Sequence, residues 1–425
     1  MDIDKVSKSV GKTLEIKGWV WRKRESKDII FLIIRDSNDV VQCTITDRHK
    51  DFSKAKKLTV ESSVIIKGKV RKDKRAPTGY EIKINDLKPV HIADRFPITK
   101  DKSAEFLLDT RHLWLRSRYL TSVLKVRHTV VGAIHKFFRD RGYYEFDAPV
   151  FQPSHCEGGS TLFEVKYFDD ITYLSQSWQL YAEAAVFALE KVYNMGPTFR
   201  SERSKTSRHL AEFWMAEAEA AWMGLDEITQ VAKDEIRFII KEVLKHNKKE
   251  LELLGQDIKK LERIVKKPFP TITYTKALEI LRKKEKMRVT WGKDLRTIEE
   301  DRLMKHFDTP VVVTHYPKKV RGFYQPVDPK NPKVCLSFDM LAPEGYGELI
   351  GGSQRDTNLK DLIKFLKLEG EKPENYEWYL DLRRFGSVPH SGYGLGVERL
   401  VAWLCKLENI KDAIPFPRTM RRFRP

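Results

Sequence analysis

The stretch FRSERSKTSRHLAEFWMAEAE, residues 199–219, sets basic and acidic side chains side by side and then alternates apolar and polar residues. The alternation is typical of a half-buried strand, and the polar run SKTS before it is typical of a loop. We therefore expect an antiparallel hairpin. Because residues four apart on a strand share a face, His209, Phe213 and Glu217 are expected on one surface.

This predicted hairpin has the side chains that a ligand with both phosphate and amine groups would need. Arg200 and Glu202 are expected to share a face of the first strand. A guanidinium can fork onto a phosphate, the ring of Phe213 can stack on a base, and a carboxylate can accept from an amine or amide. The combination suits a nucleotide together with an amino-acid-like molecule. A surface hairpin with cross-strand ion pairs is the alternative.

Two further stretches could contribute to the same site. In PHSGYGLGVERLVAWL, residues 389–404, alternating glycines precede a predicted helix whose first turn includes Arg399, which could meet a terminal phosphate. In FDMLAPEGYGELIGGSQRD, residues 338–356, Asp339 and Glu348 flank an expected turn and could hold Mg²⁺ against phosphates. A structural glycine turn and solvated turn carboxylates are the alternatives. Neither stretch matches the dinucleotide or phosphate-loop fingerprints.

The pattern along the chain predicts an α+β protein of two domains. Residues 1–95 contain five β-rich runs split by short turns, which indicates an OB-type β-barrel, with an SH3-like barrel or small sandwich as alternatives. Residues 96–117, with mixed charge, predict a linker. Residues 118–425 mix helices and strands without a βαβ rhythm, so we expect a mainly antiparallel sheet flanked by helices.

Within the larger predicted domain, a helical repeat starts at Val123 and ends before Gly142, where a C-terminal cap would sit. A strand carrying Pro149 is expected next, at an edge or interface. Further helices are expected near 226–246 and 248–267, and strands at 310–317 and 333–341.

The composition favours a nucleic-acid partner. Lys plus Arg number 79 against 60 Asp plus Glu, a formal charge of +19. Such an excess suits a polyanion, although a solvated lysine-rich surface would also explain it. The sequence contains neither a signal-like apolar region nor an apolar run long enough to span a membrane, so we expect a cytoplasmic protein without membrane contact. The four cysteines form no CxxC pair, so neither a zinc knuckle nor a disulfide framework is indicated.

Taken together, FRxE, a loop and HxxxFxxxE, followed by GxGxER, resemble the signature motifs of class II aminoacyl-tRNA synthetases. The resemblance covers essentially the whole chain and points to the subgroup for aspartate, asparagine and lysine. RHLAEFWMAEAE, GELIGGSQR, PHSGYGLGVERL and IPFPRTMRRFRP are most similar to the archaeal-type asparaginyl-tRNA synthetases. The resemblance implies an OB-fold anticodon-binding domain followed by a class II catalytic domain.

The resemblance also implies roles in binding ATP and Mg²⁺. Arg200 would bind the α-phosphate, Phe213 would stack on adenine, and Arg399 would lie near the γ-phosphate. Asp339 and Glu348 would coordinate Mg²⁺. The implied catalytic residues are Arg200, Glu202 and Arg399, and the implied ATP-binding residues are Arg200, Glu202, Arg208, His209, Leu210, Phe213, Glu348, Gly396 and Arg399.

For the amino acid, the resemblance implies five residues. Glu157 and Gln179 would hold the α-amino group, Glu217 and Arg355 would recognise the side chain, and Ser353 would also belong to the amino-acid site.

Two departures from the aspartate-specific pattern favour asparagine. Aspartate-specific relatives have QSPQxxK, whose lysine neutralises the substrate carboxylate, whereas this chain has Trp178 for the proline and Ala182 for the lysine. Glu217 stands where those relatives usually have Asp, and a longer acceptor could reach an amide NH₂. A buried carboxylate beside a substrate carboxylate costs several kcal/mol, on the order of 10³-fold in discrimination.

In the predicted barrel, Phe31 and Gln42 match positions at which this subgroup stacks on and hydrogen-bonds anticodon bases, as OB-type barrels do with unstacked RNA bases. Without the resemblance, Phe31 would be interpreted as a core residue of its strand. The implied anticodon-binding residues are Phe31, Gln42, Arg22, Arg24 and Glu81.

The expected function is ATP-dependent asparagine–tRNA ligation, with ATP and Mg²⁺ as cofactors, tRNA as partner and a homodimer as assembly. An aspartyl-tRNA synthetase, possibly charging both tRNA(Asp) and tRNA(Asn), is the nearest alternative. An enzyme that makes free asparagine from aspartyl-adenylate and a catalytically inactive RNA-binding relative are the others.

Overall fold

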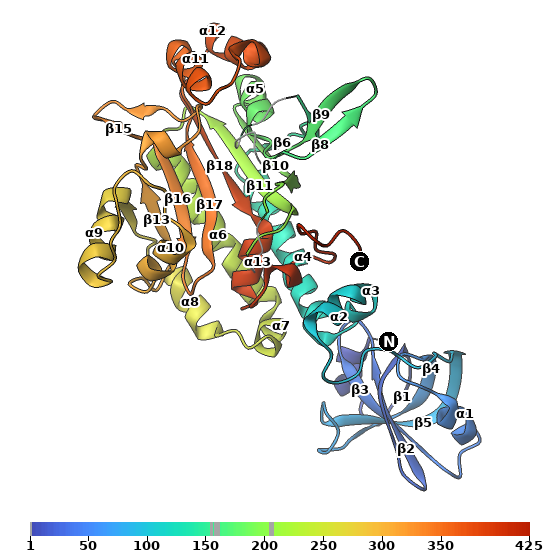
Figure 1. Ribbon diagram of the computed structural model, residues 1–425. Helices are drawn as coiled ribbons and strands as arrows, with labels where there is room; N and C mark the ends of the chain where they lie inside the picture. The colour runs from blue at the N-terminus through green and yellow to red at the C-terminus, as the bar shows by residue number, and fades with distance from the viewer. Residues whose placement is uncertain (1, 154–155, 157–161, 204–207) are drawn as a thin grey trace. The chain divides into compact units, whose positions relative to one another are not determined.

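The computed structural model describes residues 2–153, 156, 162–203 and 208–425. The chain divides into two compact units, Met1–Leu108 and Asp109–Pro425 (Figure 1). The division falls within the segment 96–117, where the structure has two short helices, α2 (Ala104–Asp109) and α3 (Arg111–Trp114).

Within residues 2–153, five strands close into a barrel in the order β1-β2-β3-β5-β4. Burial alternates along residues 29–35, where Ile30, Leu32 and Ile34 are fully buried and Phe31 between them is partly exposed, as in a barrel strand with one face toward the interior. The predicted OB-type barrel is therefore confirmed. The strands are β1 (Thr13–Glu25), β2 (Ile29–Arg35), β3 (Val40–Thr46), β4 (Ser63–Lys72) and β5 (Tyr80–His91), with α1 (Phe52–Lys57) between β3 and β4.

In the described part of the second unit, the central sheet has the order β12-β13-β16-β17-β18-β11-β10-β6. Its pairs are antiparallel except for β12–β13 and β10–β6, so the predicted mainly antiparallel sheet is confirmed. The bounds are β6 (Tyr144–Glu145), β10 (Lys191–Phe199), β11 (Glu212–Ala221), β12 (Thr271–Thr273), β13 (Val311–Thr314), β16 (Ser337–Ala342), β17 (Gly347–Gln354) and β18 (His390–Gly396).

Long amphipathic helices cover one face of this sheet. The apolar sides of α4 (Arg118–Arg139) and α6 (Leu225–His246) pack with β16, β17 and β18 in one core that includes Ile236, Ile350 and Leu395 (Figure 1). The remaining helices of this unit are α5 (Gln179–Leu189), α7 (Lys248–Leu253), α8 (Ile258–Lys266), α9 (Tyr274–Lys284), α10 (Thr297–Met304), α11 (Leu359–Leu368), α12 (Glu377–Arg384) and α13 (Val397–Leu404). Small sheets are formed by β7 (Phe151–Gln152), β8 (Glu164–Tyr167) and β9 (Asp170–Leu174), and by β14 (Val327–Asp328) and β15 (Asn331–Cys335).

The structure corrects several expected boundaries. Pro149 lies between β6 and β7 and not within a strand. The C-cap of α4 is Asp140, and Gly142 follows two residues later with a φ of +75° that a side chain would strain. The stretch 248–267 forms two helices, because Gly255 between them has a φ of +75°. Likewise, 333–341 is divided between β15 and β16.

None of the helices in the described residues combines the length and apolarity that crossing a lipid bilayer requires.

Candidate active site

The hairpin predicted from residues 199–219 forms as expected, with β10 and β11 paired antiparallel from Lys191↔Ala220 to Phe199↔Glu212. Its strands are shorter than the pattern predicted. Arg200, Glu202 and His209 lie beyond the strand ends, so the expectation that they share strand faces is wrong. Only the bond from Arg200 N–H to the Ala211 carbonyl, 3.0 Å, continues the pairing among the described residues.

Two neighbouring cavities open on the sheet beside this hairpin. The larger has a volume of about 570 Å³ and the smaller about 220 Å³. Four residues line both, so the cavities adjoin: Arg200, Met215, Glu348 and Gly394. The arrangement gives two adjoining compartments with Arg200 in their common wall.

The smaller cavity gathers the whole predicted ATP set. Phe213 forms part of its wall, and the Arg200 guanidinium lies 5.6 Å from the centre of the Phe213 ring. Arg399, on the first turn of α13 as predicted, donates to the Glu348 carbonyl oxygen. The lining includes Arg200, Glu202, Arg208, His209, Leu210, Phe213, Glu348, Gly396 and Arg399.

Ion pairs organise the rim of this cavity. Nη2 of Arg208 lies 3.1 and 3.0 Å from the two carboxylate oxygens of Asp301. His209 Nε2 lies 3.7 Å from Glu202 Oε2, and burial lowers the pKa of the imidazole. Burial, followed by the charge of Glu348, raises the pKa of Glu300 on α10 to about 8. Glu300 and Asp301 were not predicted, since no pattern in the sequence brings α10 to this site.

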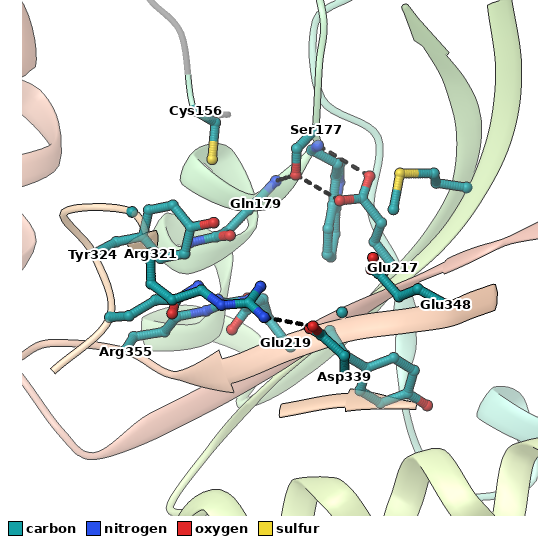
Figure 2. A pocket seen from close by; sticks show the side chains of 18 of the residues that line it. Cys156, Ser177, Gln179, Glu217, Glu219, Arg321, Tyr324, Asp339, Glu348 and Arg355 are labelled. Carbon is teal, nitrogen blue, oxygen red and sulfur yellow. Dashed lines mark hydrogen bonds and ion pairs between the residues drawn. The ribbon is translucent and has the colours of Figure 1, made fainter. Parts of the chain in front are cut away.

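The larger cavity gathers most of the predicted amino-acid set. Gln179, Glu217 and Arg355 line it (Figure 2). Ser353 does not line the cavity itself. It holds Arg355, whose Nη1 donates to Ser353 Oγ at 2.9 Å. Glu157 lies outside the described residues.

Arg355 is held by the buried carboxylate of Glu219 on β11, a pairing that sequence patterns did not indicate. Its Nε donates to Glu219 Oε1 at 2.8 Å, and Nη2 makes a second contact with the same oxygen. Burial raises the pKa of Glu219 to about 7, although the charge of Arg355 opposes the rise. The pair fixes the guanidinium at the cavity wall.

A second buried carboxylate, Glu183 on α5, lies behind this wall. It accepts from Gln179 Nε2 at 2.9 Å and from the Tyr379 hydroxyl at 2.8 Å, and it pairs with Arg383 and His390. Burial alone would raise the pKa of Glu183, but the charge of Arg383 and the hydrogen bond with His390 outweigh it, so that the pKa is lowered. Glu183 was missed because Arg383 and His390 lie about 200 residues away in the sequence.

The alternating glycines form β18 and not the turn suggested as their structural alternative. They face acidic and apolar side chains of β11 in the pairs Met215↔Gly396, Glu217↔Gly394 and Glu219↔Gly392. A Cβ at Gly394 would lie 2.2 Å from Met215 Cε. The glycines therefore leave room for the β11 side chains to lie across the sheet and line the cavities.

Asp339 and Glu348 lie on neighbouring strands, β16 and β17, and their carboxylates converge. A Cβ at Gly351 would lie 2.8 Å from Glu348 Oε1 and 3.7 Å from Asp339 Oδ1. Burial raises the pKa of Asp339 to about 7. The charge of Arg321 opposes the rise, and the charge of Glu348 adds to it. Asp339 Oδ1 is buried without a hydrogen-bond partner among the described residues.

Arg321 was not predicted, although it lines the larger cavity and pairs with Asp339 (Figure 2). It belongs to an irregular segment whose carbonyls are held by the buried Lys318. Nζ of Lys318 lies 2.8 Å from the Gly322 oxygen and 2.7 Å from the Gln325 oxygen. Irregular backbone leaves no periodicity in the sequence, so this wall could not be predicted.

The predicted anticodon residues lie on adjacent strands of the barrel. Cross-strand register pairs Arg24 with Phe31 and Gln42 with Glu81. The Arg24 guanidinium lies 4.5 Å from the centre of the Phe31 ring, and Gln42 Nε2 donates to Glu81 Oε2 at 2.9 Å. Phe31 lies outside the barrel core, so its interpretation as a core residue is wrong. Arg22 is exposed on the same strand as Arg24.

Comparisons with known proteins agree with this architecture. The family model described as tRNA synthetases class II (D, K and N) matches residues 103–420, and an OB-fold nucleic acid binding domain matches residues 14–90. The asparagine–tRNA ligase of Thermococcus gammatolerans is 48% identical over 417 residues, covering 98% of this chain and 96% of that protein. The corresponding protein of Thermoplasma acidophilum is 44% identical, with 98% and 97% covered.

Solved structures give the same result. The asparaginyl-tRNA synthetase of Pyrococcus horikoshii, complexed with asparaginyl-adenylate, superposes with a TM-score of 0.96 at 45% identity, covering 100% of this chain and 99% of that one. The Entamoeba histolytica asparaginyl-tRNA synthetase in complex with asparaginyl-adenylate has a TM-score of 0.90 at 30% identity, with 98% and 97% covered. The chain belongs to the class II aminoacyl-tRNA synthetases of the aspartate, lysine and asparagine group.

Proposed function

We propose that the protein is an asparagine–tRNA ligase, which activates asparagine with ATP and transfers it to the 3′ end of tRNA(Asn). Relatives 44–48% identical over nearly the full chain bear that name. The observation that carries the proposal is the position of Arg200, in the wall common to both cavities. The carboxylate of the amino acid must attack the α-phosphorus of ATP where the two ligands meet.

The smaller cavity would bind ATP. Arg200 would neutralise charge on the α-phosphate, Phe213 would stack on adenine, and Arg399 would meet the γ-phosphate. Glu202, Arg208 and His209 would frame the bent nucleotide, and Leu210 and Gly396 would complete the wall. Positioning and charge stabilisation would supply most of the catalysis, since no protein nucleophile is needed.

Asp339 and Glu348 fit a magnesium ion. Their carboxylates converge, and Asp339 has both a buried oxygen without a hydrogen-bond partner among the described residues and a raised pKa. A divalent cation would neutralise the repulsion between the two carboxylates. The described residues contain no group of three or more His, Cys, Asp and Glu side chains suited to a metal, so phosphate and water oxygens would have to complete the coordination. The ion would supply charge neutralisation of the phosphates.

The larger cavity would bind asparagine. Glu217 would accept from the side-chain amide NH₂, and Arg355, supported by Ser353, would donate to the amide oxygen. Gln179, with Glu157, would hold the α-amino group. Ala182, where aspartate-specific relatives have a lysine, is fully buried in an apolar cluster with Trp178 and Val186, so it provides no cation for a substrate carboxylate.

The barrel would recognise the tRNA anticodon. Phe31 would stack on a base and Gln42 would meet a base edge, held in place by its hydrogen bond to Glu81, whose side chain is almost fully buried. Arg22 and Arg24 would contact phosphates.

We further propose a cytoplasmic homodimer. Its support is a group of exposed, mutually contacting aromatic side chains on β7, β8 and the β8–β9 turn: Phe151, Tyr167 and Phe168. A dimeric mass by light scattering is expected, and a monomeric mass at micromolar concentration would contradict the assembly.

Charging assays test the function directly. Purified protein, ATP, Mg²⁺ and tRNA are incubated with labelled asparagine or labelled aspartate. We expect asparaginyl-tRNA from the first mixture and none from the second. Aspartyl-tRNA as the main product would favour the aspartyl alternative.

A further inference from the structure

The carboxylate of Glu217 is held by two donors from one short segment at the start of α5. Ser177 Oγ donates to Glu217 Oε1 at 2.6 Å, and the peptide N–H of Trp178 donates to Oε2 at 3.0 Å (Figure 2). All three residues are buried. Both oxygens of Glu217 are thereby anchored at the wall of the larger cavity.

Only the bond from Trp178 has a single possible direction. A peptide N–H has no lone pair, so Glu217 Oε2 must face Trp178 as an acceptor. Ser177 Oγ accepts from the peptide N–H of Gln179 at 3.1 Å, and its hydroxyl proton is directed to Glu217 Oε1. In this arrangement both oxygens of Glu217 accept.

A carboxylate fixed as an acceptor selects between the two candidate side chains. The asparagine amide NH₂ can donate to it, whereas the aspartate carboxylate has only lone pairs and repels it. We infer that Trp178, through its peptide N–H, and Ser177, through its hydroxyl, are positioning residues that set the preference for asparagine over aspartate. The inference rests on the proposed function, in which Glu217 meets the side-chain amide.

Trp178 offers a matched pair of substitutions. It is the N-cap of α5, with φ −78° and ψ −16°, a φ that proline can adopt, and a helix start tolerates the missing N–H. The indole packs apart from Glu217, with Nε1–H donating to the Phe146 carbonyl at 2.6 Å. Trp178→Ala therefore removes the ring and keeps the N–H, whereas Trp178→Pro removes both.

The test measures kcat/KM for asparagine and for aspartate in ATP–pyrophosphate exchange with the full chain of both variants. Relative to Trp178→Ala, Trp178→Pro is expected to lower kcat/KM for asparagine on the order of 10- to 100-fold, with KM for ATP unchanged, because a hydrogen bond to a charged group is lost. The asparagine-to-aspartate ratio falls with it. Equal ratios in the two variants overturn the inference.

Ser177 provides an independent variant if the proline variant does not fold. Ser177→Ala removes the second donor and is expected to lower the asparagine-to-aspartate ratio, while Ser177→Thr keeps a hydroxyl and restores it. An unchanged ratio in Ser177→Ala overturns the role of Ser177. A natural-sequence chain without asparagine-dependent exchange instead overturns the proposed function, so the two failures are distinguishable.

Discussion

Glu219 and Gly392 face each other across β11 and β18, and a Cβ at position 392 would lie 2.1 Å from Glu219 Oε1 and 2.4 Å from the Ala218 carbonyl oxygen. The missing side chain gives the Glu219 carboxylate the room in which it pairs with Arg355. The amino-acid cavity therefore depends on a glycine as much as on its charged residues.

Gly392→Ala is expected to destabilise the protein and to raise KM for asparagine, because the backbone oxygen of Ala218 cannot move aside as a flexible side chain would. A loss of about 2–4 kcal/mol in the free energy of unfolding is expected from overpacking and disturbance of the buried pair. Urea unfolding measures it.

Gly132→Ala is the matched control. Its Cβ would meet no atom of the described residues within 4 Å, and Gly132 lies inside α4. Alanine there should stabilise by up to about 1 kcal/mol. The same sign for both substitutions would contradict the steric account.

Arg200→Ala is expected to lower asparagine-dependent pyrophosphate exchange on the order of 10²- to 10³-fold, because charge on the α-phosphate loses its donor. The fold should remain, which circular dichroism can check. Arg288→Ala, at an exposed arginine that lines neither cavity, is the control. Retained exchange in the Arg200 variant would remove Arg200 from the mechanism.

Glu235 on α6 predicts a pH dependence of stability. It is fully buried, it accepts from the Tyr393 hydroxyl at 2.6 Å, and burial raises its pKa to about 8 from 4.5. The folded protein holds this proton where the unfolded chain releases it, so this group's effect on stability becomes less favourable as pH rises from about 4.5 to 8.

Glu235→Gln removes that titration and still accepts from Tyr393. As pH rises through this window, the free energy of unfolding of the variant should increase relative to the natural sequence, by on the order of a few kcal/mol. Thermal midpoints of both proteins between pH 5 and 9 measure the difference. A difference that does not vary with pH would exclude a raised pKa at Glu235.

Phe31→Ala is expected to weaken the use of tRNA without affecting adenylate formation. Stacking on a base contributes about 1–3 kcal/mol, so KM for tRNA should rise on the order of 10- to 100-fold. Pyrophosphate exchange without tRNA should be unchanged. Loss of exchange would show that the substitution damages the fold, and an unchanged KM would remove Phe31 from anticodon recognition.

Local patterns predicted much of this structure. The alternation around Phe213 predicted a strand and the face shared by Phe213 and Glu217, because burial on one side of a sheet imposes a period of two. The apolar run of β2 predicted a strand but not its faces, since Phe31 was interpreted as a core residue. The glycines of β18 and Arg399 on α13 were identified as candidate site residues. Whether the glycines form a strand or a turn could not be predicted, because glycine fits both.

The supporting contacts could not be predicted. Glu183, Glu219 and Arg321 are charged residues whose ion-pair partners lie elsewhere in the chain, and a single sequence contains no signal for such pairs. The ends of β10 and β11 were misplaced because the polar connection includes Arg200 and Glu202, which alternation alone does not distinguish from strand.

Activation of asparagine in preference to aspartate is best tested by ATP–pyrophosphate exchange. The purified protein is assayed without tRNA, with the two amino acids compared in parallel. We expect exchange that depends on asparagine. With aspartate the exchange should be slower on the order of 10³-fold, because Glu217 attracts an amide and repels a carboxylate. Exchange supported by aspartate, and not by asparagine, would contradict this preference.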